Sequence, residues 1–187
     1  MTDLPDLAPD CPNCAALCCM ALAFDEGEDF AISKPAGLPC PKLAAGHLCT
    51  IYDTLTEEGF SGCARYTCHG AGQRVTQELF DGATWVDQPE LATPMSEALR
   101  QMKEVHEALE LLATAEALGL EDEDEEKRAT LFAALSPEEG FTPETLAATQ
   151  PTVKAVPAFL ASLRDYICGT VSASRLSPSA ISASPRA

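Results

Sequence analysis

The sequence predicts a mainly α-helical protein with an irregular, loop-rich N-terminal module and little or no β-sheet. Three observations support this prediction. Alanine is abundant and only 6% of the 187 residues are aromatic, which favours helices over strands. Eight of the nine cysteines lie within residues 11–68, together with much of the glycine. Apolar residues at sustained helical spacing begin only beyond about residue 90.

These changes in composition divide the chain into three parts. Residues 1–90 form the cysteine-rich module, and residues 91–169 form an α-helical segment. Residues 170–187, "TVSASRLSPSAISASPRA", are small, polar and interrupted by proline. We expect this last part to be a disordered tail.

Short elements and loops are expected in the cysteine-rich module. A short helix is predicted at about 14–23, and a short helical or extended piece around "CTIYDTLTEEG". Elsewhere "SKPAGLPCPKL", "GFSGC" and "CHGAGQ" concentrate proline and glycine, which favour turns. The module is therefore predicted to contain no long regular element.

A long amphipathic helix is predicted over residues 94–118. Thr93 is expected to cap it, with Pro94 at its first position and Gly119 after its end. His106 within this helix, and the isolated Cys168, are interpreted as packing residues. The apolar residues at three- and four-residue spacings are Met95, Leu99, Met102, Val105, Leu109 and Leu112.

The acidic run "EDEDEE" at 121–126 is expected to begin a second helix that ends near Leu135, before Pro137. Acidic side chains stabilise the first turn of a helix through the macrodipole. A calcium loop is not expected, because the run lacks alternating ligands with a glycine at the bend.

Two further helices are predicted near the C-terminus. Thr142-Pro143 is typical of the start of a short helix. A separate last helix is expected in "PAFLASLRDYICG", from Pro157 to Gly169. In that helix Leu160, Leu163 and Ile167 would share one apolar face.

The charge of the chain argues against two classes of partner. The formal net charge is −17, whereas binding to nucleic acid or to anionic membranes requires basic patches. The N-terminal "MTDLPDLAPD" has no basic or apolar leader region, and no apolar run approaches the ~20 residues that span a bilayer. We expect a cytoplasmic protein that binds neither nucleic acid nor membrane.

The clustered cysteines favour metal binding over disulfides, a redox-active thiol pair or buried free thiols. Cytoplasmic thiols are kept reduced, and Cys11-x2-Cys14 has the spacing of a metal knuckle. If a helix begins near Cys14, then Cys14 and Cys18 share one face, and Cys19 lies ~100° around the helix from Cys18. Adjacent cysteines that diverge in this way predict two sites or one polynuclear cluster.

The number of thiols is enough for either arrangement. Eight thiolates can form two four-cysteine zinc sites, or one [4Fe–4S] cluster plus other ligands. His47 and His69 are each able to replace one neighbouring cysteine. A structural zinc site contributes on the order of 10–16 kcal/mol of folding free energy, which a loop-rich module with few large apolar residues needs. We therefore expect the module to be metal-stabilised.

The segments "CPNCAALCC", "PCPKLAAGHLCTIYDTL" and "GCARYTC" resemble the YkgJ-like cysteine-cluster family, described as zinc- or iron-chelating domains. Three residues separate Cys14 from Cys18 here, where the family has two. The segments "CAALCC", "DFAISKPAGLPC", "GFSGC" and "GAGQ" are more similar still to the N-terminal region of bacterial pentapeptide-repeat-containing proteins, although the repeats themselves are absent.

This resemblance covers about residues 11–118 and implies a set of metal ligands. Some members of the broader family are linked to flagellin lysine methylation with an iron–sulfur centre, which keeps an enzymatic role among the alternatives. The implied ligands are Cys11, Cys14, Cys18, Cys19, Cys40, Cys49, Cys63 and Cys68.

Three classes of function follow from the sequence. The first is a metal-binding protein that coordinates Zn²⁺ or iron, with the metal structural or stored and transferred. The second is an iron–sulfur protein in electron transfer or in a protein-modifying enzyme. The third is a zinc-stabilised interaction module whose helix at 94–118 binds a protein partner or a second copy. No catalytic constellation is recognisable, because "GAGQ" follows no strand pattern and no nucleophile–base arrangement stands out.

Overall fold

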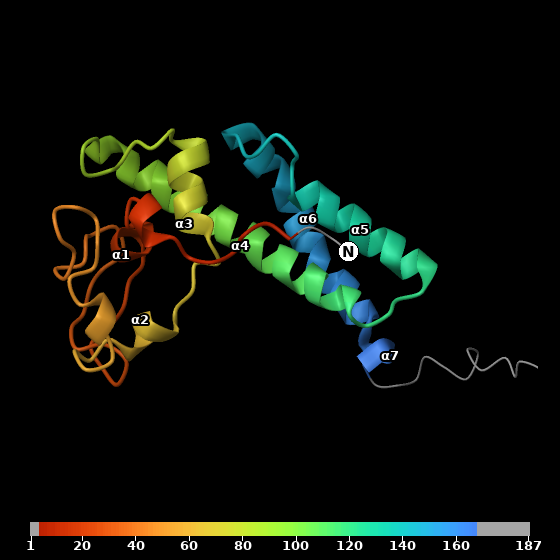
Figure 1. The fold of residues 1–187 in the computed structure, drawn as a ribbon, viewed down its shortest axis with the longest axis horizontal. Helices are drawn as coiled ribbons and strands as arrows, with labels where there is room; N and C mark the ends of the chain where they lie inside the picture. Colours follow the sequence, from red (N-terminus) through yellow and green to blue (C-terminus); the bar gives the residue numbers. More distant parts are fainter. Residues whose placement is uncertain (1–3, 168–187) are drawn as a thin grey trace, which may run out of the picture.

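The computed structural model describes residues 4–167, and Figure 1 shows their arrangement. Helices dominate this range, and its β pairing consists of two isolated antiparallel bridges, Phe24–Lys34 and Leu43–Cys49. The predicted mainly α-helical class is therefore confirmed. The predicted tail at 170–187 and Cys168 lie outside the described residues.

Three long helices form one half of the molecule: α4 (Ala92–Glu116), α5 (Asp122–Leu135) and α6 (Pro143–Ser162). Each packs against the other two, and the short α7 (Arg164–Ile167) follows α6 (Figure 1). Every residue of the predicted apolar stripe on α4 is at most 2% exposed, so this face forms the core. Long helices of this kind are held mainly by such packing.

The ends of α4 differ slightly from the prediction. A single 3₁₀ turn, η4 (Pro89–Leu91), leads into the helix, so Thr93 and Pro94 lie inside its first turn instead of capping it. The helix ends at Glu116, and Gly119 then takes the left-handed conformation with φ +64°. Glycine suits this place, because a Cβ makes a positive φ costly.

The second helix, α5, ends at Leu135 as predicted, and its first turn is acidic. Its Arg128 is only 2% exposed, and its guanidinium donates to the carboxylate of Glu125 and to the Leu112 carbonyl on α4. This buried arginine therefore ties α5 to α4.

The two predicted C-terminal helices are one. Helix α6 runs unbroken through Pro151 and Pro157 and opens with a capping box between Thr142 and Thr145. Both prolines lie on its exposed side, whereas the side chains that pack inward lie on the other face. That packing offsets the lost backbone hydrogen bonds, and the prediction of a break at Pro157 was wrong.

Short helices make up the cysteine-rich module. In chain order they are η1 (Cys11–Asn13), α1 (Leu17–Ala21), η2 (Tyr52–Thr54), α2 (Ser61–Arg65), α3 (Ala71–Arg74) and the π-helical turn η3 (Val75–Leu79). The prediction of a short helical piece near residue 52 is confirmed.

The glycine-rich segments form the predicted turns at Gly59 and Gly70, which have positive φ, and then continue into α2 and α3. A Cβ on Gly62 would lie 2.3 Å from the Phe30 ring, and one on Gly72 would lie 2.6 Å from the Cys14 sulfur. These glycines serve close packing within helices, which a turn signal in the sequence does not distinguish.

Helix α4 joins the module to the other helices. The helices α1 and α3 pack on it directly, and Leu17, Met20 and Val75 belong to the same buried cluster as the cores of α5 and α6. A second apolar contact lies further out, where Phe24, Phe30 and Phe60 pack ring to ring. The module is thus anchored to the helices through α4.

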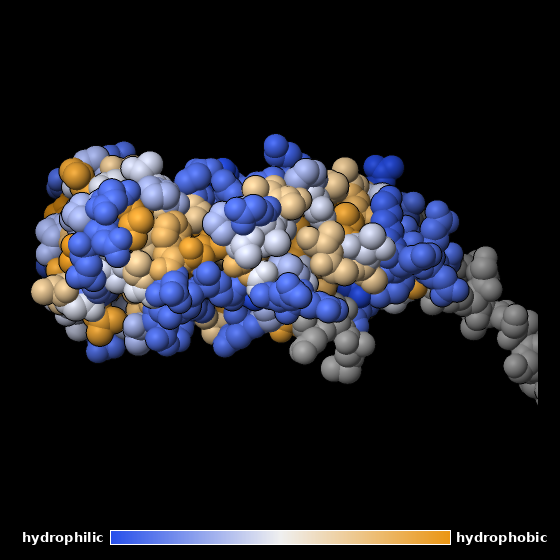
Figure 2. All heavy atoms as spheres, turned by 90° about the horizontal axis from the view of Figure 1, so that it is seen from above, coloured by the Kyte–Doolittle hydropathy of each residue, from blue (hydrophilic) through white to orange (hydrophobic). Residues whose placement is uncertain are grey.

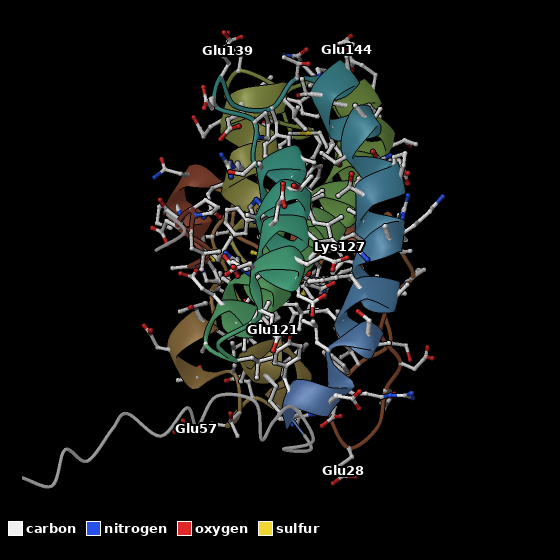
Figure 3. The ribbon with its side chains drawn as sticks, turned by 90° about the vertical axis from the view of Figure 1, so that its right-hand side faces the viewer. Glu28, Glu57, Glu121, Lys127, Glu139 and Glu144 are labelled. Carbon is white, nitrogen blue, oxygen red and sulfur yellow. The ribbon has the colours of Figure 1, made fainter. Side chains whose placement is uncertain are left out.

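Hydrophilic side chains cover much of the surface in Figure 2, most densely at the end away from the module. Figure 3, which looks along the long axis, shows Glu139 and Glu144 at the top of the view and Glu28 and Glu57 near its bottom. The large negative charge is therefore spread over the surface. Between residues 4 and 167, no helix combines the length and apolarity that crossing a membrane requires.

Candidate metal centre

All eight cysteines between residues 4 and 167 are free thiols. Cys11 is exposed, and the other seven are partly buried. A disulfide framework is therefore not observed in this part of the chain. The thiols lie in three segments, which the fold brings together around α1.

The first segment carries Cys11, Cys14, Cys18 and Cys19. The backbone N–H of Cys14 donates to the Cys11 carbonyl at 3.2 Å, which closes the tight turn expected of a metal knuckle. Cys14 itself is extended, and Ala16 has φ +51°, so α1 begins only at Leu17. The short helix predicted at about 14–23 is thus confirmed only over Leu17–Ala21, and the condition under which Cys14 and Cys18 would share one helix face is not met.

The backbone just before α1 forms hydrogen bonds with side chains more than sixty residues later in the chain, on η3 and in the loop that follows it. The N–H of Ala15 donates to the Thr76 hydroxyl at 3.0 Å, and that hydroxyl donates to the Gly72 carbonyl at 2.9 Å. The indole N–H of Trp85 donates to the Ala15 carbonyl. These long-range bonds fix Cys14 beside α3.

Cys18 is at the centre of the thiol group. A side-chain hydrogen bond with Cys19, followed by burial, raises the pKa of Cys18 above its usual range. The two adjacent thiols are therefore close enough to interact, in spite of the ~100° between their positions on a helix. This interaction favours a shared centre over two independent sites for the pair.

The second segment carries Cys40 and Cys49. The N–H of Cys40 donates to the Cys19 carbonyl at 3.0 Å, so this loop lies directly on the end of α1. The antiparallel bridge between Leu43 and Cys49 closes the loop and brings Cys49 back toward Cys40. The predicted loop thus carries two thiols to the same side of the module.

The third segment carries Cys63 on α2 and Cys68 just before α3. Burial, together with charge on Cys18, Cys40 and Cys49, raises the pKa of Cys63 to about 11. Burial likewise raises the pKa of the Cys14 thiol to about 11, with Cys18 and Cys68 contributing.

Charge on neighbouring thiols links Cys11 to the same group. Burial raises the pKa of Cys11, and repulsion from Cys18, Cys68 and Cys49 adds to this. All eight predicted ligands therefore lie in one electrostatically coupled group. Such thiols resist ionisation until a cation compensates their charge.

The two neighbouring histidines differ in their surroundings. His69 has Nδ1 2.9 Å from Glu110 and Nε2 4.0 Å from Glu107, so both ring nitrogens face carboxylates on α4. His47 has a buried Nε2 without a hydrogen-bond partner, and its ring edge faces Trp85. Of the two, His47 has the nitrogen available to a ligand.

Helix α4 supports the third segment through His106. Its Nδ1 lies 2.5 Å from the His69 carbonyl oxygen and therefore carries the proton, while Nε2 lies 3.5 Å from Arg74. Burial lowers the pKa of His106 to about 4. The packing role predicted for His106 is confirmed, and the hydrogen bond to the residue after Cys68 adds a positioning role.

Three residues next to the thiols were not predicted from the sequence. Lys34 is buried between the first two segments, and Gly72 allows the Cys14 sulfur to approach α3. The Tyr66 hydroxyl is buried without a hydrogen-bond partner, and its pKa is raised by burial and by charge on Cys18 and Cys68. No local sequence signal identifies these residues, because each contact joins distant segments.

The donor chemistry fits a thiophilic ion. Among residues 4–167, no three cysteine, histidine or acidic side chains already have the geometry of a metal site. The eight thiols nevertheless belong to one group, and the space beside the Cys14 and Cys68 sulfurs is one that a Cβ on residue 72 would fill. Soft thiolate ligands select zinc, copper(I) and iron–sulfur clusters.

Comparison with known proteins finds a bacterial relative. Over 104 residues the chain is 42% identical to YybG of Bacillus subtilis (strain 168), an uncharacterized protein. The match covers 56% of this chain and 37% of YybG, so the chain spans little more than a third of that relative. No protein-family model matches the chain. No solved structure matches it either.

Proposed function

We propose that this chain is a metal-binding protein whose N-terminal module coordinates Zn²⁺ or iron through its eight clustered cysteines. The observation that carries the proposal is that eight free thiols from three segments lie in one group, in which Cys18 is close to Cys11, Cys14, Cys19 and Cys63. Thiolate-rich groups of this kind bind zinc or iron–sulfur clusters. We also propose that the module is of the YkgJ-like kind, in keeping with its cysteine spacing.

The packing of the module supports a structural contribution from the metal. Residues 22–59 contain no helix longer than a 3₁₀ turn, and their exposed apolar side chains include Leu38, Leu48 and Tyr52. Buried area therefore stabilises this loop weakly. A metal held by Cys19, Cys40 and their neighbours would join the loop to α1 and α2, as structural zinc does in small modules.

An iron–sulfur centre is the second candidate, and one observation favours it. The side chains of Cys18 and Cys19 interact directly, although one mononuclear site does not easily take two adjacent helix residues. A polynuclear centre accepts both thiols, because its metal atoms offer separate coordination positions. Such a centre would serve electron transfer or a protein-modifying enzyme.

The metal content and the UV-visible spectrum of the full chain, purified without oxygen, test both candidates. About two zinc ions per chain and no visible absorbance would support mononuclear zinc sites. Iron, labile sulfide and a broad band near ~400 nm would support the iron–sulfur candidate. A folded chain that holds neither metal would contradict the proposal.

A further inference from the structure

The side chain of Lys34 is buried inside the cysteine-rich module and is only 4% exposed. Its ammonium donates to three backbone carbonyls, those of Met20 at 3.2 Å, Pro35 at 3.2 Å and Leu38 at 2.7 Å. The three N–H bonds of the ammonium are thereby all used. The backbone of Lys34 is fixed as well, through its bridge to Phe24.

These carbonyls place the ammonium beside two of the thiol segments. Met20 follows Cys19 directly, and Leu38 lies two residues before Cys40. The N–H of Cys40 in turn donates to the Cys19 carbonyl at 3.0 Å. Lys34 therefore lies where the loop of Cys40 meets the helix that carries Cys18 and Cys19.

Within residues 4–167, no carboxylate lies within ion-pair distance of the Lys34 ammonium. Carbonyl oxygens solvate a buried cation but do not neutralise it, and an unpaired buried charge is costly. Burial lowers the pKa of Lys34, and the groups that oppose this effect are the thiols of Cys40, Cys19, Cys18 and Cys63. The negative charge that would balance the Lys34 ammonium therefore comes from these cysteines in their thiolate form.

We propose that Lys34 is the built-in counter-ion of an anionic metal centre that takes thiolate ligands from Cys18, Cys19, Cys40 and Cys63. The inference rests on the metal-binding function proposed above and adds the ligand set and charge of one site. The occupant contains a divalent thiophilic ion such as Zn²⁺. Each such ion that is bound by four thiols releases four protons to solvent and gives a complex with a net charge of −2.

A lysine at this position stabilises the loaded site in two ways. Its charge offsets half of the −2 charge of the complex in a partly buried place, where the attraction is weakly screened. Its three hydrogen bonds also hold the Cys40 loop against α1. The remaining thiols, on Cys11, Cys14, Cys49 and Cys68, are left for a second ion or for the other part of a larger cluster.

The test measures the zinc affinity of the full chain by competition with a chromophoric chelator. Lys34→Gln keeps hydrogen-bond donors but removes the charge, and we expect it to weaken zinc binding at this site by roughly 10–100-fold, as loss of outer-shell partners does. Lys34→Arg keeps the charge and should stay close to wild type. Lys42→Gln is the matched control, because Lys42 pairs with Glu58 on the surface of the same module.

The outcomes separate this inference from the function on which it rests. A wild-type chain that binds no zinc or iron overturns the proposed function. Wild-type affinity in Lys34→Gln overturns only the counter-ion role, and so does an equal loss in Lys34→Gln and Lys34→Arg. The far-UV circular dichroism of the chain, to which the long helices α4, α5 and α6 contribute most, reports whether each variant folds. If the Gln variant does not, Lys34→Met replaces it with an apolar side chain of similar length.

Discussion

At the scale of single residues, the surroundings of the eight thiols depend on Lys34 and Gly72. The thiols themselves stand out in the sequence through their number, clustering and spacing. Lys34 and Gly72 are ordinary residue types in the sequence, and their importance comes from contacts with Cys40 and Cys14 that only the fold creates. Long-range contacts of this kind leave no local pattern.

Gly72 provides the residue-scale prediction. A Cβ at this position would lie 2.6 Å from the Cys14 sulfur, so Gly72→Ala must displace that thiol or shift α3. We expect the zinc affinity of the full chain to fall at least ~10-fold, the lower end of the effect of disturbing a ligand's support. Chelator competition measures this change.

Gly46→Ala is the control for that substitution. Gly46 lies between Cys40 and Cys49 and does not need a positive φ, and a Cβ added there would have no other atom within 4 Å. We expect its zinc affinity to match wild type. Equal affinities in the Gly72 and Gly46 variants would mean that the Cys14 thiol takes no part in metal binding.

At the scale of elements, hydrophobic periodicity predicted well where one face is buried. The stripe on α4 is spaced for a helix and is buried along its length, so the prediction for 94–118 differs from Ala92–Glu116 only at the ends. The apolar face of α4 is covered by α1, α5 and α6. Docking of a partner through this helix stays a prediction and would have to use its other face.

Helix-breaking residues in the sequence predicted the helix boundaries poorly. Proline at 157 predicted the start of a helix, yet α6 continues through it because Val156 and Phe159 pack into the core on either side. Lys127 of α5, labelled in Figure 3, also lies over the Phe159 ring. Tertiary packing of this kind outweighs a local propensity.

His106 gives the element-scale prediction, because it joins α4 to the Cys68 segment. Its pKa is about 4 in the folded chain, against 6.5 for a free imidazole, because burial and the nearby Arg74 disfavour its cation. Below pH 6.5 the unfolded chain therefore binds more protons than the folded chain, so the free energy of unfolding falls as the pH drops toward 4. The loss approaches about 3 kcal/mol.

Urea denaturation at several pH values between about 4 and 7 measures this effect, with His106→Gln as the reference. The Gln side chain can donate to the His69 carbonyl but does not titrate. Wild type should lose more stability than this variant over the range, and subtracting the two curves removes contributions from metal release. Parallel curves would show that His106 is not held neutral.

At the scale of the whole molecule, the structure is an α-helical scaffold that carries a loop-rich module at one end (Figure 1). The core runs from α1 and α3 through α4 into α5 and α6, so the helices hold the inner side of the module. Its outer loop, which carries Cys40 and Cys49, is held by two short β-bridges and by the hydrogen bonds of Lys34. The central claim is that a metal completes this outer part.

Counting reactive thiols in the folded chain, before and after a strong chelator is added, tests that claim most directly. Thiolates bound to a metal do not react with a colorimetric thiol reagent, whereas free thiols do. The chain contains nine cysteines, of which eight are the proposed ligands. We predict that at most one thiol, Cys168, reacts in the folded, metal-loaded chain and that all nine react once the metal is removed. Nine reactive thiols before chelation would contradict the account.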